Sequence, residues 1–228
     1  PTAVFETAII QWAALKFNRM DESAQFNDLY DALKQNFRRL VTLDEETESF
    51  NEHYEGWKIL FSSVAGSSED EQTVKLLQYI AEEAGFHTAF AYVDEVVFND
   101  EEGVFFDGEN YEYWFKLVPW EDIAVEEGEL AIILKNIVQN QKAIILNPAY
   151  TLLFQSKGIL KILWDLYPNH PLLLQASDKP IAGKKCVKKP VFGREGANVS
   201  VIEADGSISL QNGGDYGANR AIYQEFYE

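Results

Sequence analysis

The segment from Lys188 to Asn198 has the residue types and spacing of a phosphate-binding loop. Lys189 lies in an alternating stretch that predicts a strand, and Gly193 and Gly196 bracket the loop that follows. Lysine and glycine-rich backbone together suit a polyphosphate, because ammonium and N–H groups offset its charge from several directions. Arg194 adds a planar fork of donors. The same pattern also occurs at strand ends that bind no nucleotide, so chemistry alone leaves both readings open.

A second lysine, Lys157, follows Ser156, the predicted N-cap of a helix over Ser156–Tyr167. The helix dipole disfavours a cation there, so a nearby anion would remove the conflict. In the alternative reading the helix begins near Ala149, and Lys157 lies on an ordinary surface. The last predicted strand, Ala221–Tyr227, could offer an adenine an apolar face and backbone groups, or could be a core strand.

The charge of the chain excludes some partners and suggests others. Its 228 residues carry a formal net charge of −18, which argues against a nucleic-acid partner. Six basic residues and no acidic one fall between Lys179 and Arg194. This island indicates an anionic ligand or a solvated basic strand edge. No apolar run of roughly 20 residues and no signal-peptide pattern occurs. We therefore expect a cytoplasmic protein without a membrane partner.

Periodicity predicts a mixed α/β (α+β) fold. A strand, loop and helix from Lys58 to Gly85 place the loop Gly66–Glu71 at the carboxyl end of a parallel strand, where such sheets bind ligands. Glu69 and Glu71 there either attract an amine or simply favour the helix dipole. One cysteine and three scattered histidines show no metal-ligand spacing. The other predicted helices are Thr2–Leu15, Phe26–Leu40 and Glu129–Asn140; the other strands are His87–Phe98, Tyr113–Val118, Ala143–Leu146 and Lys185–Phe192, with a hairpin over Val199–Leu210 that closes on a two-residue turn, Asp205-Gly206.

Several long segments, in order, resemble the glutathionylspermidine synthase family: residues 1–6, 69–74, 115–121, 156–160, 163–171, 187–199 and 222–226. The resemblance implies an ATP-grasp fold with a substrate-side domain over 1–146 and a nucleotide-binding domain over 147–228. It implies an ATP-dependent ligase that joins a glutathione- or peptide-like carboxylate to a polyamine-like amine through an acyl phosphate. The alternative is a non-catalytic member that binds nucleotide or peptide as a regulatory or interaction module. Oligomeric state stays open.

Site residues also follow from the resemblance. Arg194 would be catalytic. Magnesium ligands would lie in strands before Pro1, and further contacts after Glu228, so the resemblance predicts a fragment that is inactive alone. The ATP contacts would be Lys157, Lys189, Gly193, Glu195, Gly196, Gln224, Glu225, Phe226 and Tyr227, and the substrate contacts Thr2, Ala3, Glu6, Glu69 and Glu71.

Overall fold

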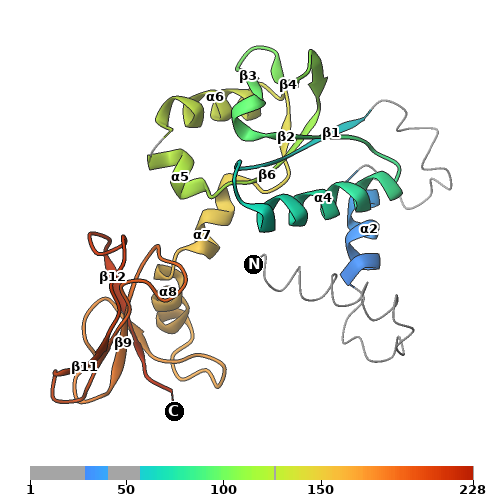
Figure 1. Cartoon of the computed structure of the whole chain (residues 1–228). Coiled ribbons are helices and arrows are strands. Elements are labelled where there is room, and N and C mark those ends of the chain that lie inside the picture. The colour runs from blue at the N-terminus through green and yellow to red at the C-terminus, as the bar shows by residue number, and fades with distance from the viewer. Residues whose placement is uncertain (1–28, 41–56, 126, 228) are drawn as a thin grey trace. The chain divides into compact units, whose positions relative to one another are not determined.

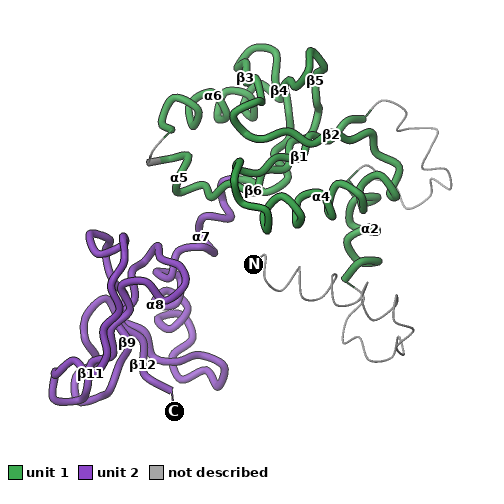
Figure 2. Tube along the Cα trace, viewed as in Figure 1, with its two compact units in different colours: residues 1–148 green, residues 149–228 purple. Residues whose placement is uncertain are grey.

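The structure, a computed structural model, describes residues 29–40, 57–125 and 127–227. The chain divides into two compact units, residues 1–148 and 149–228, coloured separately in Figure 2. Unit 1 contains a four-stranded and a three-stranded sheet, and unit 2 contains a five-stranded sheet. Within the described ranges, no helix is both long and apolar enough to cross a bilayer.

A parallel sheet in the order β2-β1-β6-β7 forms the centre of unit 1 (Figure 1). Five of the six residues of β1 are buried, as is typical of a parallel strand covered on both faces. The predicted strand–helix–strand order is confirmed, because β1 and β2 pair in parallel on either side of α4 in the chain. The strands are β1 (Lys58–Ser63), β2 (His87–Tyr92), β6 (Tyr113–Leu117) and β7 (Ile144–Ile145).

Each face of this sheet is covered by its own helices. On one face, Ile59 and Phe61 pack with residues of α2 (Leu29–Arg39) and α4 (Ser68–Glu83). On the other, Leu60 and Trp114 pack with α5 (Trp120–Val125), α6 (Gly128–Gln139) and part of the small second sheet. The alternation of β1 explains this division, since successive side chains point to opposite faces. The core of unit 1 therefore has two halves.

Local signals set the ends of α4. Ser67 is its N-cap, and its Oγ accepts a hydrogen bond from the Asp70 amide at 3.3 Å. Gly85, just after the helix, has a φ of 105°, which a residue with a Cβ rarely adopts. The predicted C-terminal glycine stop is confirmed.

Parts of unit 1 differ from the sequence predictions. The segment His87–Phe98 is in strands as predicted, but a 3-10 helix (Val93–Glu95) divides it into β2 and β3 (Val97–Asn99). The strands β4 (Gly103–Phe106) and β5 (Glu109–Tyr111), and helix α5, were not predicted. Their apolar runs are too short to show a period. The predicted helix Thr2–Leu15 lies outside the described residues.

Unit 2 is built on an antiparallel sheet in the order β11-β10-β9-β12-β8 (Figure 1). Helix α8 packs against the sheet at β8. The elements are a 3-10 turn (Ala149–Thr151), α7 (Leu152–Gln155), α8 (Gly158–Leu166), β8 (Ala176–Ser177), β9 (Cys186–Pro190), β10 (Ser200–Ile202), β11 (Ile208–Gln211) and β12 (Ala221–Glu225).

Two predictions in unit 2 need correction. The last strand ends at Glu225 rather than Tyr227. The hairpin between β10 and β11 is confirmed, but its turn is longer than the predicted two residues. The Glu203 amide donates to the Ser207 carbonyl at 2.8 Å, which leaves three residues in the loop. Gly206, with a φ of 88°, completes it. Three-residue hairpin loops commonly place glycine in this conformation, so Asp-Gly marks the turn but not its length.

Three donors converge on Glu83 at the end of α4, and two of them, from Tyr30 and Lys34, join α2 to this helix. Tyr30 Oη donates at 2.6 Å, Lys34 Nζ at 3.0 Å and Tyr79 Oη at 3.0 Å. The hydrogen bond from Tyr30, followed by those from Lys34 and Tyr79, lowers the pKa of Glu83 from 4.5 to about 2. Because the folded-state pKa is depressed, this stabilisation is present above pH 4.5 and is lost as pH falls from 4.5 toward 2.

Replacing Glu83 by Gln is therefore expected to loosen α2 at neutral pH, since the charged acceptor for three donors is lost. Hydrogen exchange of the amides in residues 29–39 should speed up. Glu69→Gln, an exposed acid in the first turn of the same helix, is the matched control. If α2 exchanges at the same rate in both variants, Glu83 does not hold it.

Candidate functional site

Lys189 is held on the sheet of unit 2 by a neutral partner. It lies opposite Ile222 of β12, and its Nζ donates to Gln224 Oε1 at 2.8 Å. Gln224 pairs with Val187, two residues before Lys189, so both polar side chains lie on one face of the sheet. Partial burial lowers the pKa of Lys189. In the described part of the chain no carboxylate is bonded to Lys189, so an anion could still use its charge.

Lys157 reaches the loop that follows β9. Its amide donates to the Val191 carbonyl at 2.8 Å, and its Nζ donates to the Gly193 carbonyl at 2.5 Å. The structure thus joins the start of α8 to the glycine loop, although 36 residues separate Lys157 from Gly193. Main chain and side chain both contribute, so the position of this lysine is well defined.

Lys157 is the N-cap of α8, one residue later than the predicted cap. Ser156 has an extended conformation and ends the short helix α7, and its Oγ accepts from the Gly158 amide at 3.2 Å. The alternative of one continuous helix from Ala149 is wrong. A cation at a helix N-terminus opposes the dipole, so the conflict seen in the sequence is present in the fold.

The loop from Gly193 to Asn198 has an unusual backbone. Glu195, Gly196 and Asn198 have φ values of 52°, 74° and 54°. Glu195 and Gly196 are adjacent left-handed residues, and the Ala197 amide donates to the Arg194 carbonyl across them at 2.9 Å, so they form a tight turn. Arg194, Glu195 and Gly196 are exposed. The turn therefore presents these three residues at the surface.

The segment predicted to lie along an adenine is partly engaged by neighbouring strands. The amides of Glu225 and Phe226 donate to the carbonyls of Gln175 and Lys185, at 2.8 Å and 3.0 Å. The Phe226 ring lies under Lys185 Nζ, 4.5 Å from its centroid. Tyr227 is 80% exposed. The end of this segment therefore offers aromatic surface to a ligand, and the amides of Glu225 and Phe226 are already used within the sheet.

Two cations of the basic island have structural partners. Lys184 Nζ lies 2.8 Å from Glu225 Oε1, and Lys185 Nζ lies 3.1 Å from Glu203 Oε1. Exposed ion pairs of this kind contribute little to stability, yet they neutralise part of the charge. The island as a whole is therefore weaker support for an anionic ligand than its sequence suggests, and Lys189, whose printed partner is a neutral amide, is the stronger part of the case.

In unit 1, the acids predicted to lie near an amine are at the carboxyl edge of β1. Glu69 is exposed. Glu71 forms an ion pair with Lys75 and accepts a hydrogen bond from Tyr92 Oη at 2.9 Å. The bond from Lys75, followed by that from Tyr92, lowers the pKa of Glu71. Glu71 thus already has two partners. Thr2, Ala3 and Glu6 lie outside the described residues.

Sequence reasoning missed a buried lysine at the same edge of the sheet. Lys116 is 0% exposed, and its Nζ donates to the Val118 carbonyl at 2.6 Å. The ammonium lies 4.0 Å from the Trp120 ring centroid. The Asn147 side chain bonds to the main chain of Lys116. The main-chain carbonyl of Asn147 accepts a hydrogen bond from Trp120 Nε1 at 2.7 Å. The available signal was a lysine at an inward position of an apolar strand.

No metal site is evident in residues 29–40, 57–125 and 127–227, where no group of three or more His, Cys, Asp or Glu side chains could hold an ion. The described residues therefore do not supply ligands for the magnesium that the resemblance implies.

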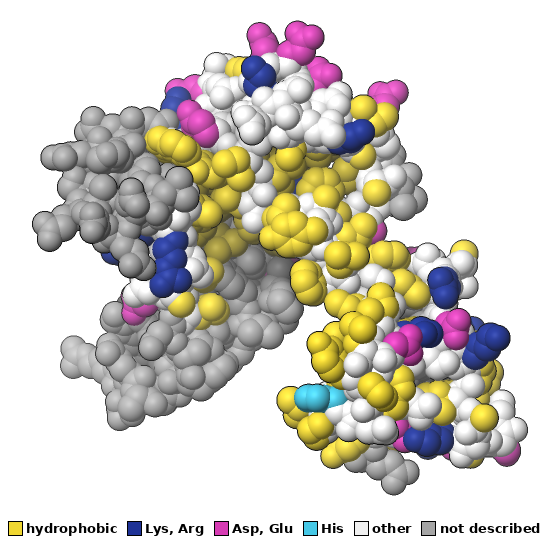
Figure 3. Space-filling model, turned by 180° about the vertical axis from the view of Figure 1, so that it is seen from behind, with side chains coloured by type: hydrophobic (Ala, Val, Ile, Leu, Met, Phe, Trp, Pro, Cys, Tyr) yellow, Lys and Arg dark blue, Asp and Glu magenta, His cyan; other side chains and the backbone are white. Residues whose placement is uncertain are grey.

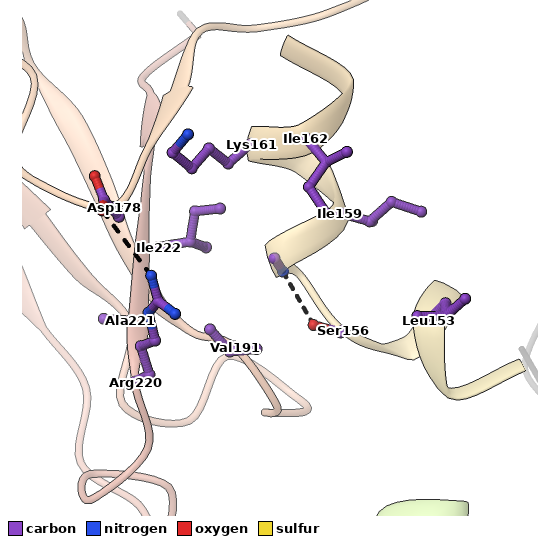
Figure 4. A pocket seen from close by; sticks show the side chains of 11 residues that line it. Leu153, Ser156, Ile159, Lys161, Ile162, Asp178, Val191, Arg220, Ala221 and Ile222 are labelled. Atoms are coloured by element: carbon purple, nitrogen blue, oxygen red, sulfur yellow. Dashed lines mark hydrogen bonds and ion pairs between the residues drawn. The ribbon is translucent and has the colours of Figure 1, made fainter. Parts of the chain in front are cut away.

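A pocket of about 490 Å³ lies on unit 2 between α8 and the sheet (Figure 4). Ile159, Val191 and Ile222 give it apolar walls, and Asp178 and Arg220 form an ion pair of 3.9 Å at one side. None of the predicted ATP contacts lines it. Figure 3 shows hydrophobic side chains at the surface of the face that it draws. The exposed large hydrophobic residues of unit 2 include Tyr150, Leu153, Phe154, Ile162, Leu166 and Leu172. The apolar walls of the pocket do not suit phosphates.

Comparison with known proteins places the chain in a family. Residues 1–228 match the family model described as glutathionylspermidine synthase preATP-grasp. A putative acid–amine ligase of Haemophilus influenzae is 30% identical over 240 residues, which cover 100% of this chain and 57% of that protein. The trypanothione synthetase of Crithidia fasciculata is 32% identical over 83 residues, covering 35% of this chain and 13% of the relative. The chain thus spans little more than half the length of the Haemophilus influenzae relative.

A solved structure of the ATP-grasp ligase PsnB complexed with minimal precursor shows 12% identity and a TM-score of 0.41, over 75% of this chain and 64% of that one. This likeness is too weak to support an argument about the site. The family match, in contrast, extends over every residue. The chain belongs to the glutathionylspermidine synthase family.

Proposed function

We propose that this chain forms the nucleotide-binding part of an ATP-dependent ligase that joins a carboxylate to an amine. One observation carries the proposal: Lys157, at the start of α8, contacts the Gly193 carbonyl of the glycine loop, and Lys189 lies on β9, the strand that leads into that loop. Two ammonium groups and left-handed loop backbone are suited to a triphosphate. The names of the relatives, an acid–amine ligase and a trypanothione synthetase, support the reaction class.

In this proposal each residue has a defined part. Lys157 and Lys189 offset the charge of the phosphates, and the Glu195 and Gly196 backbone contacts them. Gln224 orients Lys189 through its amide oxygen. Glu225, Phe226 and Tyr227 lie along the adenine. Phosphoryl transfer is catalysed mainly by positioning and by electrostatic stabilisation. Residues that bind and orient the nucleotide in this way are therefore the ones that the proposal requires.

Arg194 is proposed to act on the group that is transferred. A carboxylate oxygen attacks the γ-phosphorus, ADP leaves, and an acyl phosphate forms. The amine then attacks the acyl carbon and phosphate leaves. The exposed guanidinium of Arg194 can follow the charge that develops on the phosphoryl oxygens. No step is assigned to magnesium, because the described residues hold no group of ligands that fits it.

The substrates are proposed by class. A glutathione- or peptide-like acid would meet Thr2, Ala3 and Glu6, and a polyamine-like amine would approach Glu69 and Glu71. Because Glu71 already pairs with Lys75 and Tyr92, an ammonium there would share or replace the Lys75 contact. Glu69, which is exposed, offers the more direct contact.

The proposal is tested by measuring ATP binding and ADP release from the 228-residue chain and from the whole product of its gene. We expect ATP binding by both, and release of ADP that depends on added thiol peptide and polyamine from the whole product alone. Binding without any turnover by either would favour a non-catalytic binding module. Absence of ATP binding from both would overturn the proposal.

A further inference from the structure

A second glycine-containing loop lies against the loop Gly193–Asn198, which we call the phosphate loop. It runs from Asn212 to Asn219, between β11 and β12, and we call it the bracing loop. Sequence analysis assigned it no role. In the fold, β9 and β12 are neighbouring strands, so the loops that leave β9 and enter β12 meet at one end of the sheet.

Hydrogen bonds join the two loops along their length. The Asn198 amide donates to the Gly213 carbonyl at 3.1 Å, and Asn198 Oδ1 accepts from the Tyr216 amide at 2.7 Å. Asn212 Nδ2 donates to the Gly196 carbonyl at 3.3 Å. Asn219 Nδ2 donates to the Phe192 carbonyl, just before the phosphate loop, at 3.1 Å. Both ends of the phosphate loop are therefore tied to the bracing loop.

The approach of the two loops is close enough to require glycine at Gly214. A Cβ built there would lie 2.6 Å from the Ala197 Cβ and 3.0 Å from Asn198 Oδ1. Carbon atoms do not approach to 2.6 Å, so any side chain at this position must displace the phosphate loop or the bracing loop. Gly214 also has a φ of 149°, which disfavours other residues.

The bracing loop explains how the phosphate loop keeps its backbone. Glu195 and Asn198 are not glycine, yet both have a left-handed φ, which is unfavourable for residues with a Cβ. Strained conformations persist where surrounding contacts over-determine them. At Asn198 such contacts are the bond from its amide to the Gly213 carbonyl and the bond from the Tyr216 amide to its Oδ1.

We propose that the bracing loop is a positioning element, and that Gly214 and Asn212 hold the phosphate loop in the shape that receives the nucleotide. The inference rests on the proposed function, because the nucleotide is what the shaped loop would bind. Neither positioning residue is one of the predicted ATP contacts. Their effect is expected to pass through the backbone of Glu195 and Gly196.

The test compares Gly214→Ala with Gly206→Ala. Gly206 also has positive φ, at 88°, but lies in the β10–β11 turn, where a Cβ would meet nothing within 4 Å. It therefore controls for the strain of a Cβ at positive φ, although its φ is smaller, without the clash. Titration with ATP and magnesium should show affinity about tenfold lower in Gly214→Ala than in Gly206→Ala, because loss of one or two well-placed hydrogen bonds changes binding by roughly that factor. Asn212→Ala, which removes only the donor to Gly196, should lose about two- to tenfold.

Hydrogen exchange of residues 193–198 without nucleotide provides a second readout. Exchange should be faster in Gly214→Ala than in Gly206→Ala if the braces hold the loop. Changed exchange with unchanged ATP affinity would show a merely structural role and overturn the inference. If Gly214→Ala does not fold, the affinity of Asn212→Ala decides. ATP binding by the parent chain, with equal affinity in all variants, overturns the inference alone; no ATP binding by the parent overturns the proposed function as well.

Discussion

ATP binding is expected to weaken about ten- to hundredfold when either Lys189 or Lys157 is replaced by Ala, with the fold retained. A charge-assisted hydrogen bond to phosphate contributes roughly 1.5–3 kcal/mol, which corresponds to that range. Within the part of the chain that the structure describes, Lys189 Nζ is bonded to a neutral amide, and Lys157 is positioned by its bonds to the Val191 and Gly193 carbonyls. Calorimetric titration measures the loss.

Matched controls separate the site from general charge effects. Lys188 is the exposed neighbour of Lys189 and points to the opposite face of β9. Lys161 lies on α8, the helix that Lys157 caps, and its ammonium pairs with Asp165. Lys188→Ala and Lys161→Ala should bind ATP as the parent does. An equal loss in all four variants would mean that only the net charge matters, and would remove both assignments.

The stability of unit 1 is expected to rise with pH because of Lys116. Burial lowers its pKa from 10.5 to about 8, against the opposing effect of Glu121 and Asp122. Below pH 8 the lysine is charged in the folded and unfolded chain, and the penalty of burying the charge is present in full. Between pH 8 and 10.5 the folded chain gives up the proton first. The unfolded chain then binds more protons, so the free energy of unfolding increases with pH.

The expected rise attributable to Lys116 is about 2 kcal/mol between about pH 7 and about pH 9.5, since each pKa unit corresponds to roughly 1.4 kcal/mol. Lys116→Met keeps most of the side-chain volume and removes the titration. Urea unfolding of parent and variant at both pH values gives the change in the free energy of unfolding for each protein. The difference between the two changes belongs to Lys116, because the tyrosines and the other lysines titrate in both proteins. An identical change in both proteins would show that Lys116 does not set the slope. Lys188→Met, at an exposed position, should behave as the parent.

Local signals were sufficient for much of the fold. Gly85 stops α4 because only a residue tolerant of positive φ can follow that helix end, and this holds in any context. The parallel pairing of β1 and β2 follows from a helix placed between two apolar strands. The strands between Gly103 and Tyr111 were missed because they are short. They are stabilised by pairing with neighbouring strands, and their own residue pattern is too brief to predict them.

The candidate site divides in the same way. The types and spacing of Lys189, Gly193, Arg194 and Gly196 pointed to a phosphate loop or to an ordinary strand end, whereas the longer resemblance was enough to predict the family that the comparison then showed. The conflict of Lys157 with its helix dipole was also readable, because it depends only on adjacent residues.

By itself, the sequence determined most of the longer elements, the position of the glycine loop and the family, since each depends on neighbouring residues or on linear order. Only the tertiary structure decided which partners the charges have. Gln224 accepts a hydrogen bond from Lys189, 35 residues away in the sequence. Glu71, which pairs with Lys75, also accepts a hydrogen bond from Tyr92 of β2. The bracing loop and the burial of Lys116 are likewise decided by strand order and packing, because contacts between segments distant in sequence leave no local pattern.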